Sequence, residues 1–305
     1  MVKQIPKINF KLLCNGNRSS IEEKVEFDNL KIALQKYGFL IIENHSVAYE
    51  EIKNVFALYR VFFNQSVADK YRVDMSRTSS NRGWGPTKSE RVNPDFQPDT
   101  KEVFDCGPNI NIRHDFEYSP YYAKNIWPEN IPLFRETIER FYNTCAKLSM
   151  EILKQIEDAL GFSDNYFKNK FDLPMALLRC NYYPTKCNSF TGNALGVAPH
   201  TDYGCLTLLF TDGTPGLEVE LPSKKWGQVN VNKNEIIVNF GEMLEIWSKR
   251  QIKATKHRVI RGSSERFSIP FFFNPQYDTV ISNEPKILAG DYLSARYNQT
   301  YLHKT

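Results

Sequence analysis

The stretch ALLRCNYY at residues 176–183, which Pro184 ends, opens the part of the chain that decides the fold. Its apolar and aromatic side chains are typical of a strand, and short apolar segments follow it, separated by Gly, Pro, Asn and Asp at intervals of roughly 8–12 residues. This spacing indicates a β-sandwich or a barrel. We expect the further strands at residues 206–210, 217–221, 227–231, 236–240, 244–247, 257–260 and 267–273.

The chain before Phe171 has a mostly helical pattern. Ser20 and Glu23 form a capping-box pattern, which predicts a helix from there to residue 36, with Gly38 as its stop. The other expected elements are a strand at 39–42, a helix at 49–63, an irregular segment at 77–120, a long helix with a wide apolar face at 128–160 and a last helix at 290–301.

Together these elements predict a mainly β protein with flanking helices, in which the long helix packs on a double-sheet β core. We see no internal repeat and no linker. We therefore expect a single domain over residues 1–305, with residues 1–170 as its mostly helical N-terminal part and residues 171–305 as its β core.

Composition narrows the classes of function. The 305 residues are 41% hydrophobic and 24% charged, which excludes a disordered chain. A net charge of +4, with Lys and Arg scattered, gives no indication of a nucleic-acid partner. The start lacks a signal-peptide pattern and no run reaches the roughly 18 apolar residues of a membrane span, so we expect a cytoplasmic protein with no membrane partner. The six cysteines form no Cys-x-x-Cys pair, which favours free thiols over disulfides.

Three residues of the β-rich half are candidate metal ligands. His200 and Asp202 lie two positions apart, so on extended backbone their side chains point to one face, and His257 begins a later strand candidate. Two imidazoles and one carboxylate form the facial triad of a mononuclear Fe(II) site, which leaves coordination positions open. The alternative is a surface or core histidine beside a turn aspartate, since a lone His-x-Asp occurs by chance.

Arg266 and Ser268 share one face of the strand that follows His257. A guanidinium with a neighbouring hydroxyl is a natural receptor for a carboxylate, because arginine binds carboxylates through two hydrogen bonds. Arginine on such an apolar strand is costly to bury without an anionic partner. The partner is either a ligand or a carboxylate of the protein itself.

These residues, in the order His200-Thr201-Asp202, His257 and Arg266-Phe267-Ser268 and preceded by Asn181-Tyr182-Tyr183-Pro184, resemble the 2-oxoglutarate- and Fe(II)-dependent dioxygenases of the isopenicillin N synthase-like superfamily. Residues 5–10, 37–45, 82–84 and 99–105 resemble the N-terminal part of that family, so the likeness covers nearly the whole chain.

The resemblance implies a double-stranded β-helix, or jelly roll, and a set of roles. His200, Asp202 and His257 would be the catalytic iron ligands. The cosubstrate 2-oxoglutarate would be bound at one carboxylate by the residues Arg266, Ser268 and Tyr183, and nearer the metal by Asn181. The enzyme would use Fe(II), O2 and 2-oxoglutarate, with ascorbate as a candidate reductant, and would release succinate and CO2. His45 would be a packing or hydrogen-bonding residue, and His114 and His303 surface residues.

The substrate is expected to be a small organic molecule that is hydroxylated, desaturated or ring-closed by a monomeric enzyme. Arg82, Phe104 and Phe272 are the candidate substrate contacts, although core packing and an internal salt bridge explain such residues equally well. Three alternatives stay open: an Fe(II)/O2 oxidase of the same superfamily that does not use 2-oxoglutarate, an ethylene-forming-type enzyme, and a non-catalytic jelly-roll binding module.

Overall fold

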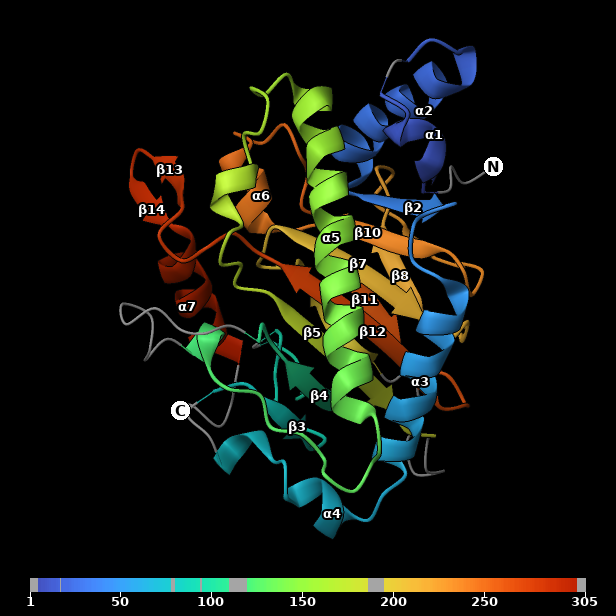
Figure 1. The fold of residues 1–305 in the computed structure, drawn as a ribbon, viewed down its shortest axis with the longest axis vertical. Coiled ribbons are helices and arrows are strands. Elements are labelled where there is room, and N and C mark those ends of the chain that lie inside the picture. The colour runs from blue at the N-terminus through green and yellow to red at the C-terminus, as the bar shows by residue number, and fades with distance from the viewer. Residues whose placement is uncertain are drawn as a thin grey trace.

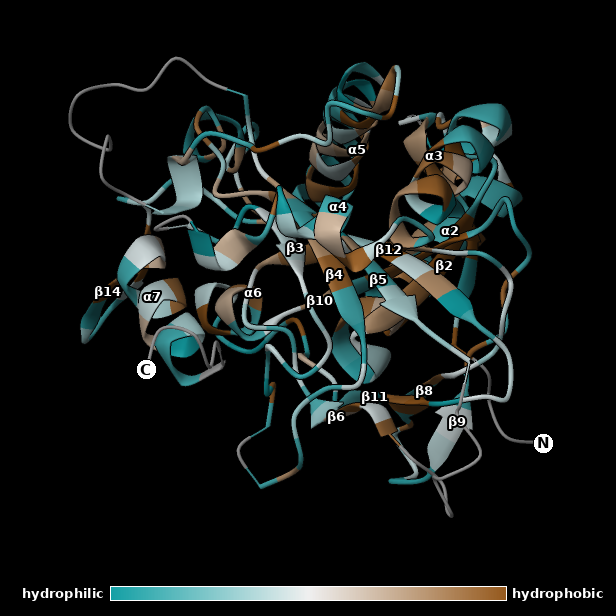
Figure 2. Ribbon diagram, turned by 90° about the horizontal axis from the view of Figure 1, so that it is seen from below, coloured by the Kyte–Doolittle hydropathy of each residue, from teal (hydrophilic) through white to brown (hydrophobic). Residues whose placement is uncertain are grey.

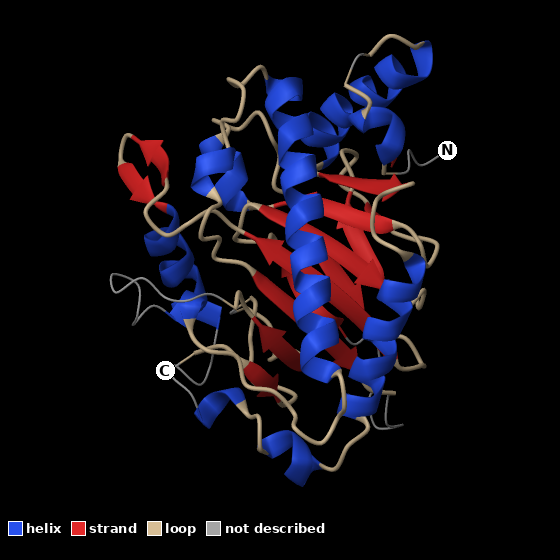
Figure 3. Ribbon diagram, viewed as in Figure 1, coloured by secondary structure: helices blue, strands red, loops and turns tan. Residues whose placement is uncertain are grey.

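The computed structural model describes residues 5–16, 18–77, 80–93, 95–109, 120–185 and 195–300. Figure 3 shows strands in the centre and helices around them. The strands are β1 Lys7–Asn9, β2 Phe39–Glu43, β3 Gly83–Gly85, β4 Glu102–Cys106, β5 Leu177–Tyr183, β6 Leu195–His200, β7 Leu206–Thr211, β8 Leu217–Glu220, β9 Trp226–Gln228, β10 Ile236–Phe240, β11 His257–Ile260, β12 Arg266–Phe273, β13 Val280–Asn283 and β14 Lys286–Leu288. The helices are α1 Phe10–Cys14, α2 Ile21–Ile32, α3 Tyr49–Phe63, α4 Val67–Tyr71, α5 Phe134–Leu160, α6 Glu242–Trp247 and α7 Ala289–Thr300, and π- or 3-10 turns lie at η1 Ala33–Tyr37, η2 Met75–Arg77, η4 Pro120–Tyr122 and η5 Lys168–Lys170.

Two sheets stack to form the β core. In the larger sheet the strand order is β1-β2-β10-β7-β12-β5-β4-β3, and in the smaller it is β6-β11-β8-β9. Helix α5 crosses the larger sheet (Figure 1), and the view in Figure 2 places α3 and α5 on one side of this sheet and the smaller sheet on the other. The long helix packed on a double-sheet core, with jelly-roll strands, is the fold that the sequence predicts.

Alternation along each strand of the larger sheet separates two environments. Leu178, Cys180 and Tyr182 of β5 belong to the apolar core under the helices. Arg179 and Asn181, between them on the same strand, point instead to the space between the sheets and line a cavity there. The core therefore lies mainly between helices and sheet, and the inner face is left for polar side chains.

The N-terminal part of the chain also contributes to the larger sheet. Strands β1 and β2 extend it at one edge, β1 pairing in parallel with β2, and β3 and β4 extend it at the other. Ser20 and Glu23 form the expected capping box of α2, and the chain turns at Gly38 with a φ of 65° after the π-helical turn η1. None of the described helices is long and apolar enough to cross a membrane.

Three expected elements are wrong in part. Residues 244–247 are not a strand but belong to α6, whose first backbone N–H groups, of Glu242 and Met243, donate to the carbonyls of Asp202 and Tyr203. The long helix begins at Phe134 and not at 128, because Pro132 disfavours helix in the residue before it and Leu133 is left-handed, with a φ of 61°.

The third correction concerns the segment expected to be irregular. Residues 77–120 contain β3 and β4. The alternation of β4 is hidden in the sequence because its inward-facing Asp105 is a buried charge, paired with an arginine 74 residues away.

Candidate active site

The structure brings the three predicted metal ligands together. His200 ends β6, His257 begins β11, and the two residues are paired directly across these antiparallel strands. Asp202 follows His200 in the loop after β6, and its Oδ1 lies 3.9 Å from His200 Nε2 and 3.6 Å from His257 Nε2. The three potential ligand atoms lie within 4.8 Å of one another, so a single ion can reach all of them.

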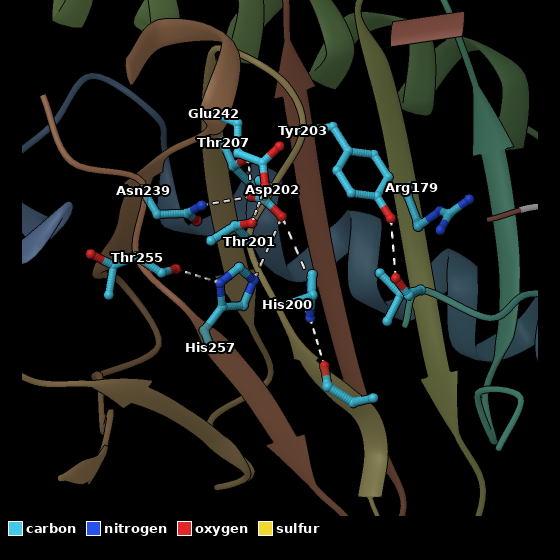
Figure 4. Close-up of polar contacts among 12 residues, drawn as sticks. Arg179, His200, Thr201, Asp202, Tyr203, Thr207, Asn239, Glu242, Thr255 and His257 are labelled. Carbon is cyan, nitrogen blue, oxygen red and sulfur yellow. Dashed lines mark hydrogen bonds and ion pairs between the residues drawn. The ribbon is translucent and has the colours of Figure 1, made fainter. Parts of the chain in front are cut away.

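The outer atoms of the same side chains are held by hydrogen bonds (Figure 4). Asp202 Oδ2 accepts from Thr207 Oγ1 and from Asn239 Nδ2, each at 2.6 Å. His200 Nδ1–H donates to the carbonyl of Ala198 at 2.7 Å, and His257 Nδ1–H to that of Thr255 at 3.2 Å. These bonds leave Nε2 of each ring and Oδ1 of the aspartate for a metal, which is the usual outer-shell arrangement of a ligating histidine.

The protonation states suit metal binding. Burial, with a smaller effect of the neighbouring His257, lowers the pKa of His200 to about 3, so its Nε2 lone pair is free at neutral pH. Burial opposes ionisation of Asp202, but the two histidines and the hydrogen bonds from Thr207 and Asn239 bring its pKa below the ordinary value. Two imidazoles and one carboxylate, with no thiolate, are the donor set that Fe(II) accepts while keeping positions open.

The four residues predicted to bind 2-oxoglutarate also lie together. Across the β12–β5 ladder Arg266 faces Tyr183 and Ser268 faces Asn181, and all four are buried. Arg266 Nε donates to the carbonyl of Thr214 at 3.3 Å, while its Nη1 is buried without a hydrogen-bond partner among the described residues. No carboxylate of these residues forms an ion pair with Arg266. A buried guanidinium without an ion pair in the described part of the chain fits an anionic ligand, and that part supplies no internal carboxylate for it.

Both groups open into one cavity of about 140 Å³ between the sheets. His200, Asp202 and His257 line it, as do Arg266, Ser268, Asn181 and Tyr183. Phe272, predicted as a substrate contact, also lines this cavity.

The other two predicted substrate contacts are placed elsewhere. Arg82 is buried outside this cavity, beside a separate one of about 40 Å³, and donates to the carbonyls of Asn81 and Tyr121 at 3.1 and 2.6 Å. Phe104 faces the helices, with its ring centroid 4.9 Å from that of Phe62 and 5.4 Å from that of Phe134. Neither side chain therefore lines the cavity of the candidate metal ligands, because one binds backbone carbonyls and the other packs in the apolar core.

Sequence reasoning missed a network of buried charges on the cavity wall. Arg179 donates to both oxygens of Glu90 at 2.7 and 2.9 Å and to both oxygens of Asp105 at 2.6 and 2.8 Å. Lys101 donates to Glu90 at 3.0 Å and to Asp99 at 2.7 Å. One signal for it was available, because Arg179 interrupts an apolar strand just as Arg266 does.

A second set of contacts that sequence reasoning missed joins the loop of Thr201 and Asp202 to the C-terminal helix. Glu242 accepts hydrogen bonds from Thr201 Oγ1, which lies between the two candidate ligands, from Tyr292 at 2.6 Å and from Arg296 at 2.9 Å. Tyr292 and Arg296 belong to the C-terminal helix α7. No sequence pattern indicates this contact.

The remaining histidines and the cysteines agree with prediction where the structure describes them. His45 Nε2 is hydrogen-bonded to the carbonyl of Asn234 at 3.0 Å, far from the cavity. Cys14, Cys106, Cys145, Cys180 and Cys205 are free thiols. His114, His303 and Cys187 lie outside the described residues.

Two family profiles match the chain. Residues 174–275 match the 2OG-Fe(II) oxygenase superfamily, and residues 5–130 match the N-terminal region described for a non-haem dioxygenase in morphine synthesis. The first match contains every predicted iron and carboxylate contact.

Curated relatives are similar over most of the chain. A 2-oxoglutarate-Fe(II) type oxidoreductase of Metarhizium rileyi is 28% identical over 92% of this chain and 83% of its own length. A proline hydroxylase of Petromyces alliaceus is 29% identical over 95% of this chain and 96% of its own length.

Solved structures agree with these likenesses. A full-length Neurospora crassa enzyme in complex with α-ketoglutarate, another name for 2-oxoglutarate, superposes with a TM-score of 0.81 at 27% identity, covering 96% of this chain and 95% of that one. A protein solved with 2-oxoglutarate, Fe and JA has a TM-score of 0.76 at 29% identity, covering 92% and 77%.

Proposed function

The chain is a member of the 2-oxoglutarate- and Fe(II)-dependent oxygenase superfamily, and from that premise we propose which residues carry its dioxygenase activity. His200, Asp202 and His257 hold the iron. Arg266 and Ser268, with Tyr183, bind the distal carboxylate of 2-oxoglutarate, and Asn181 lies toward its metal end.

One observation carries this proposal. The buried Nη1 of Arg266 has no hydrogen-bond partner among the described residues, and Arg266 lines the same cavity as three potential ligand atoms that lie within 4.8 Å of one another. A dianion with one carboxylate at each end, such as 2-oxoglutarate, would supply an anionic partner for the guanidinium and a second carboxylate for a cation held by those three residues.

The protein groups then act by binding and orientation. When bound, Fe(II) and 2-oxoglutarate supply the oxidising chemistry that consumes O2 and yields succinate and CO2. Thr207 and Asn239 fix the Asp202 carboxylate so that one oxygen faces the metal position. The apolar walls from Val197, Val259 and Leu209 limit the water around the reacting atoms.

The substrate is a small molecule, and we propose that Phe272 contacts it. Relatives indicate the range of substrates: one is named a proline hydroxylase, and the Neurospora crassa enzyme was also solved with thymine. Hydroxylation, desaturation and ring closure all use this ligand set, so the reaction is proposed only as oxidation of a small organic molecule.

The cellular setting is proposed on more general grounds. The small net charge and its scatter support an enzyme that works without nucleic acid. We propose in addition that it is one domain, because the sequence contains no linker, and that it is a monomer in the cytoplasm. Light scattering on the purified chain tests the monomer.

Succinate formation tests the residue roles. With Fe(II), 2-oxoglutarate, O2 and ascorbate, the wild type should form succinate, and Asp202→Ala and His257→Ala should lose both iron and succinate formation. His45→Ala is the matched control, because that histidine is hydrogen-bonded far from the cavity. Full turnover in either ligand variant would contradict the assignment, and O2 consumption without succinate would favour an oxidase that does not use 2-oxoglutarate.

A further inference from the structure

The charge network lies directly beyond the proposed cosubstrate position. Along the β12–β5 ladder Arg266 faces Tyr183, Ser268 faces Asn181 and Phe272 faces Leu177. Arg179 is the inward-facing residue between Asn181 and Leu177. Figure 4 shows Arg179 and Tyr203 on the side of Asp202 away from His257. A substrate placed beside the cosubstrate therefore meets the wall that contains this network.

The cationic side chains of that wall are already paired with carboxylates of the protein. Lys101 is paired with Glu90 and Asp99, and Arg179 with Glu90 and Asp105. Among the described residues that line the cavity, Arg266 is the lysine or arginine that lacks a carboxylate partner, and 2-oxoglutarate takes it. A carboxylate on the substrate would have no cation left to bind.

The wall also has one carboxylate that is only partly paired. Arg179 binds Glu90 and Asp105, and Lys101 binds Glu90 and one oxygen of Asp99. Asp99 Oδ2 accepts from Lys101, while its Oδ1 accepts no hydrogen bond from the described residues. Burial, only partly opposed by Lys101, also raises the pKa of Asp99. A hydrogen-bond donor from a ligand would complete it.

The size and the remaining walls of the cavity restrict the ligand further. At about 140 Å³ the cavity is smaller than the roughly 300–1,000 Å³ of typical small-molecule sites, and the cosubstrate occupies part of it. Tyr203, Tyr297 and Phe272 line it with aromatic rings. Such flat apolar surfaces suit a single ring.

On the basis of the proposed function, we propose that the primary substrate is a small ring compound that donates an N–H hydrogen bond to Asp99 and carries no carboxylate: a cyclic amine, a lactam or an N-heterocycle. Like charges brought together in a buried site cost several kcal/mol, so an acid on the same ring should bind at least about tenfold more weakly.

Matched probes test this inference. The wild type, loaded with Mn(II) and 2-oxoglutarate so that no turnover is needed, is titrated calorimetrically with amine, amide and acid forms of the pyrrolidine, piperidine, pyridine and pyrimidine rings. Tighter binding of the amine or amide form than of its acid in at least one series supports the inference. Equal or tighter binding of the acids, or no binding in any series, overturns it.

A pair of carboxylate-to-amide variants locates the effect. Asp99→Asn should reduce the preference for the N–H donor over the acid by about tenfold or more, because it removes one negative charge and adds a donor. Glu102→Gln is the control, since Glu102 binds Lys70 and Trp84 outside the cavity and should keep the preference. If Asp99→Asn does not fold, Glu90→Gln replaces it with the same expected direction, and an unchanged preference in the folded variant overturns the inference.

The outcome is separable from that of the proposed function. Succinate formed from 2-oxoglutarate in the absence of any substrate measures the iron and cosubstrate roles alone. A wild type that prefers amines but forms no succinate would contradict only the proposed function, whereas succinate formation with tight binding of acids would contradict only the substrate class.

Discussion

The two faces of the larger sheet are built from the same strands but are opposite in chemistry. On β12, Phe267, Ile269, Phe271 and Phe273 are at most 1% exposed and pack into the core beneath the helices. The alternate residues of the same strand, from Arg266 to Phe272, line the cavity. The period of two in a strand therefore separates stability from function within eight consecutive residues.

The difference has an energetic cause. The helix face is stabilised by burial of apolar area, which needs no particular partner. On the inner face each buried charge must be matched, and most are, through Arg179, Lys101 and their carboxylates. The exception among the described residues of this face is Arg266, which is the proposed contact of the ligand carboxylate.

The largest expected effect lies on the helix face. Phe104→Ala should lower the free energy of unfolding by about 3–5 kcal/mol, because it leaves a hole in an aromatic cluster. Chemical denaturation measures this change. The folded fraction should keep the wild-type KM for 2-oxoglutarate; a raised KM would show that the two faces are coupled.

Arg266→Lys should weaken cosubstrate binding and leave stability nearly unchanged. An ammonium does not reproduce the two-point geometry of a guanidinium, so the KM for 2-oxoglutarate should rise by about 10- to 100-fold while the midpoint of thermal unfolding changes little. Steady-state kinetics with succinate as the readout measures the first and calorimetry the second. An unchanged KM would remove the carboxylate-binding role.

A smaller effect is expected from Asn239, which hydrogen-bonds the proposed iron ligand Asp202. Asn239→Ala removes one of the two hydrogen bonds to Asp202 Oδ2 and should weaken iron binding by about tenfold. Metal titration of the apoprotein measures it. Asn232→Ala, which removes only a side-chain hydrogen bond to Glu235, is the control and should bind iron as the wild type does.

The smallest effect concerns the pH dependence of stability. Burial alone would raise the pKa of Glu90, but Arg179 and Lys101 lower it from 4.5 to about 2. Because the folded-state pKa lies below the unfolded one, Glu90 stabilises the fold above pH 4.5 and this contribution is lost as the pH falls toward 2. Denaturation between pH 5.5 and 3 should therefore show a shallower acid loss in Glu90→Gln; an equal slope in both proteins would place the acid sensitivity elsewhere.

Much of this architecture could be predicted from local pattern. Most of the expected strands from 176 onward lie within a residue or two of their observed ends, because Gly, Pro, Asn and Asp punctuate them. The short run at 244–247 was wrong because four apolar residues fit a buried strand and a buried helix equally well. Backbone hydrogen bonds from the start of α6 to Asp202 and Tyr203 favour a helix in this segment.

The candidate site also contains one part that the sequence predicts and one part that it does not. His200, Asp202, His257 and Arg266 could be proposed from the sequence because residue type and spacing within the chain carry their chemistry. The charge network could not be proposed. Arg179 interrupts an apolar strand as Arg266 does, but its pairing with Asp105 and Glu90 spans 74 and 89 positions and depends on the register between β4 and β5. Arg82 and Phe104 show the converse: an arginine and an aromatic ring in a loop-rich segment suggested a ligand, but both side chains complete the protein interior.

The contact of Glu242 with Tyr292 and Arg296 has a consequence for anyone who shortens this chain. Removal of α7 would take away no strand of either sheet and none of the proposed iron or 2-oxoglutarate contacts, yet it would withdraw Tyr292 and Arg296, the two α7 side chains that hold Glu242 against Thr201. A protein trimmed at residue 288 could thus retain its β core and still have a loosened iron loop, so purity and folding alone would be poor guides to whether a shortened version is competent.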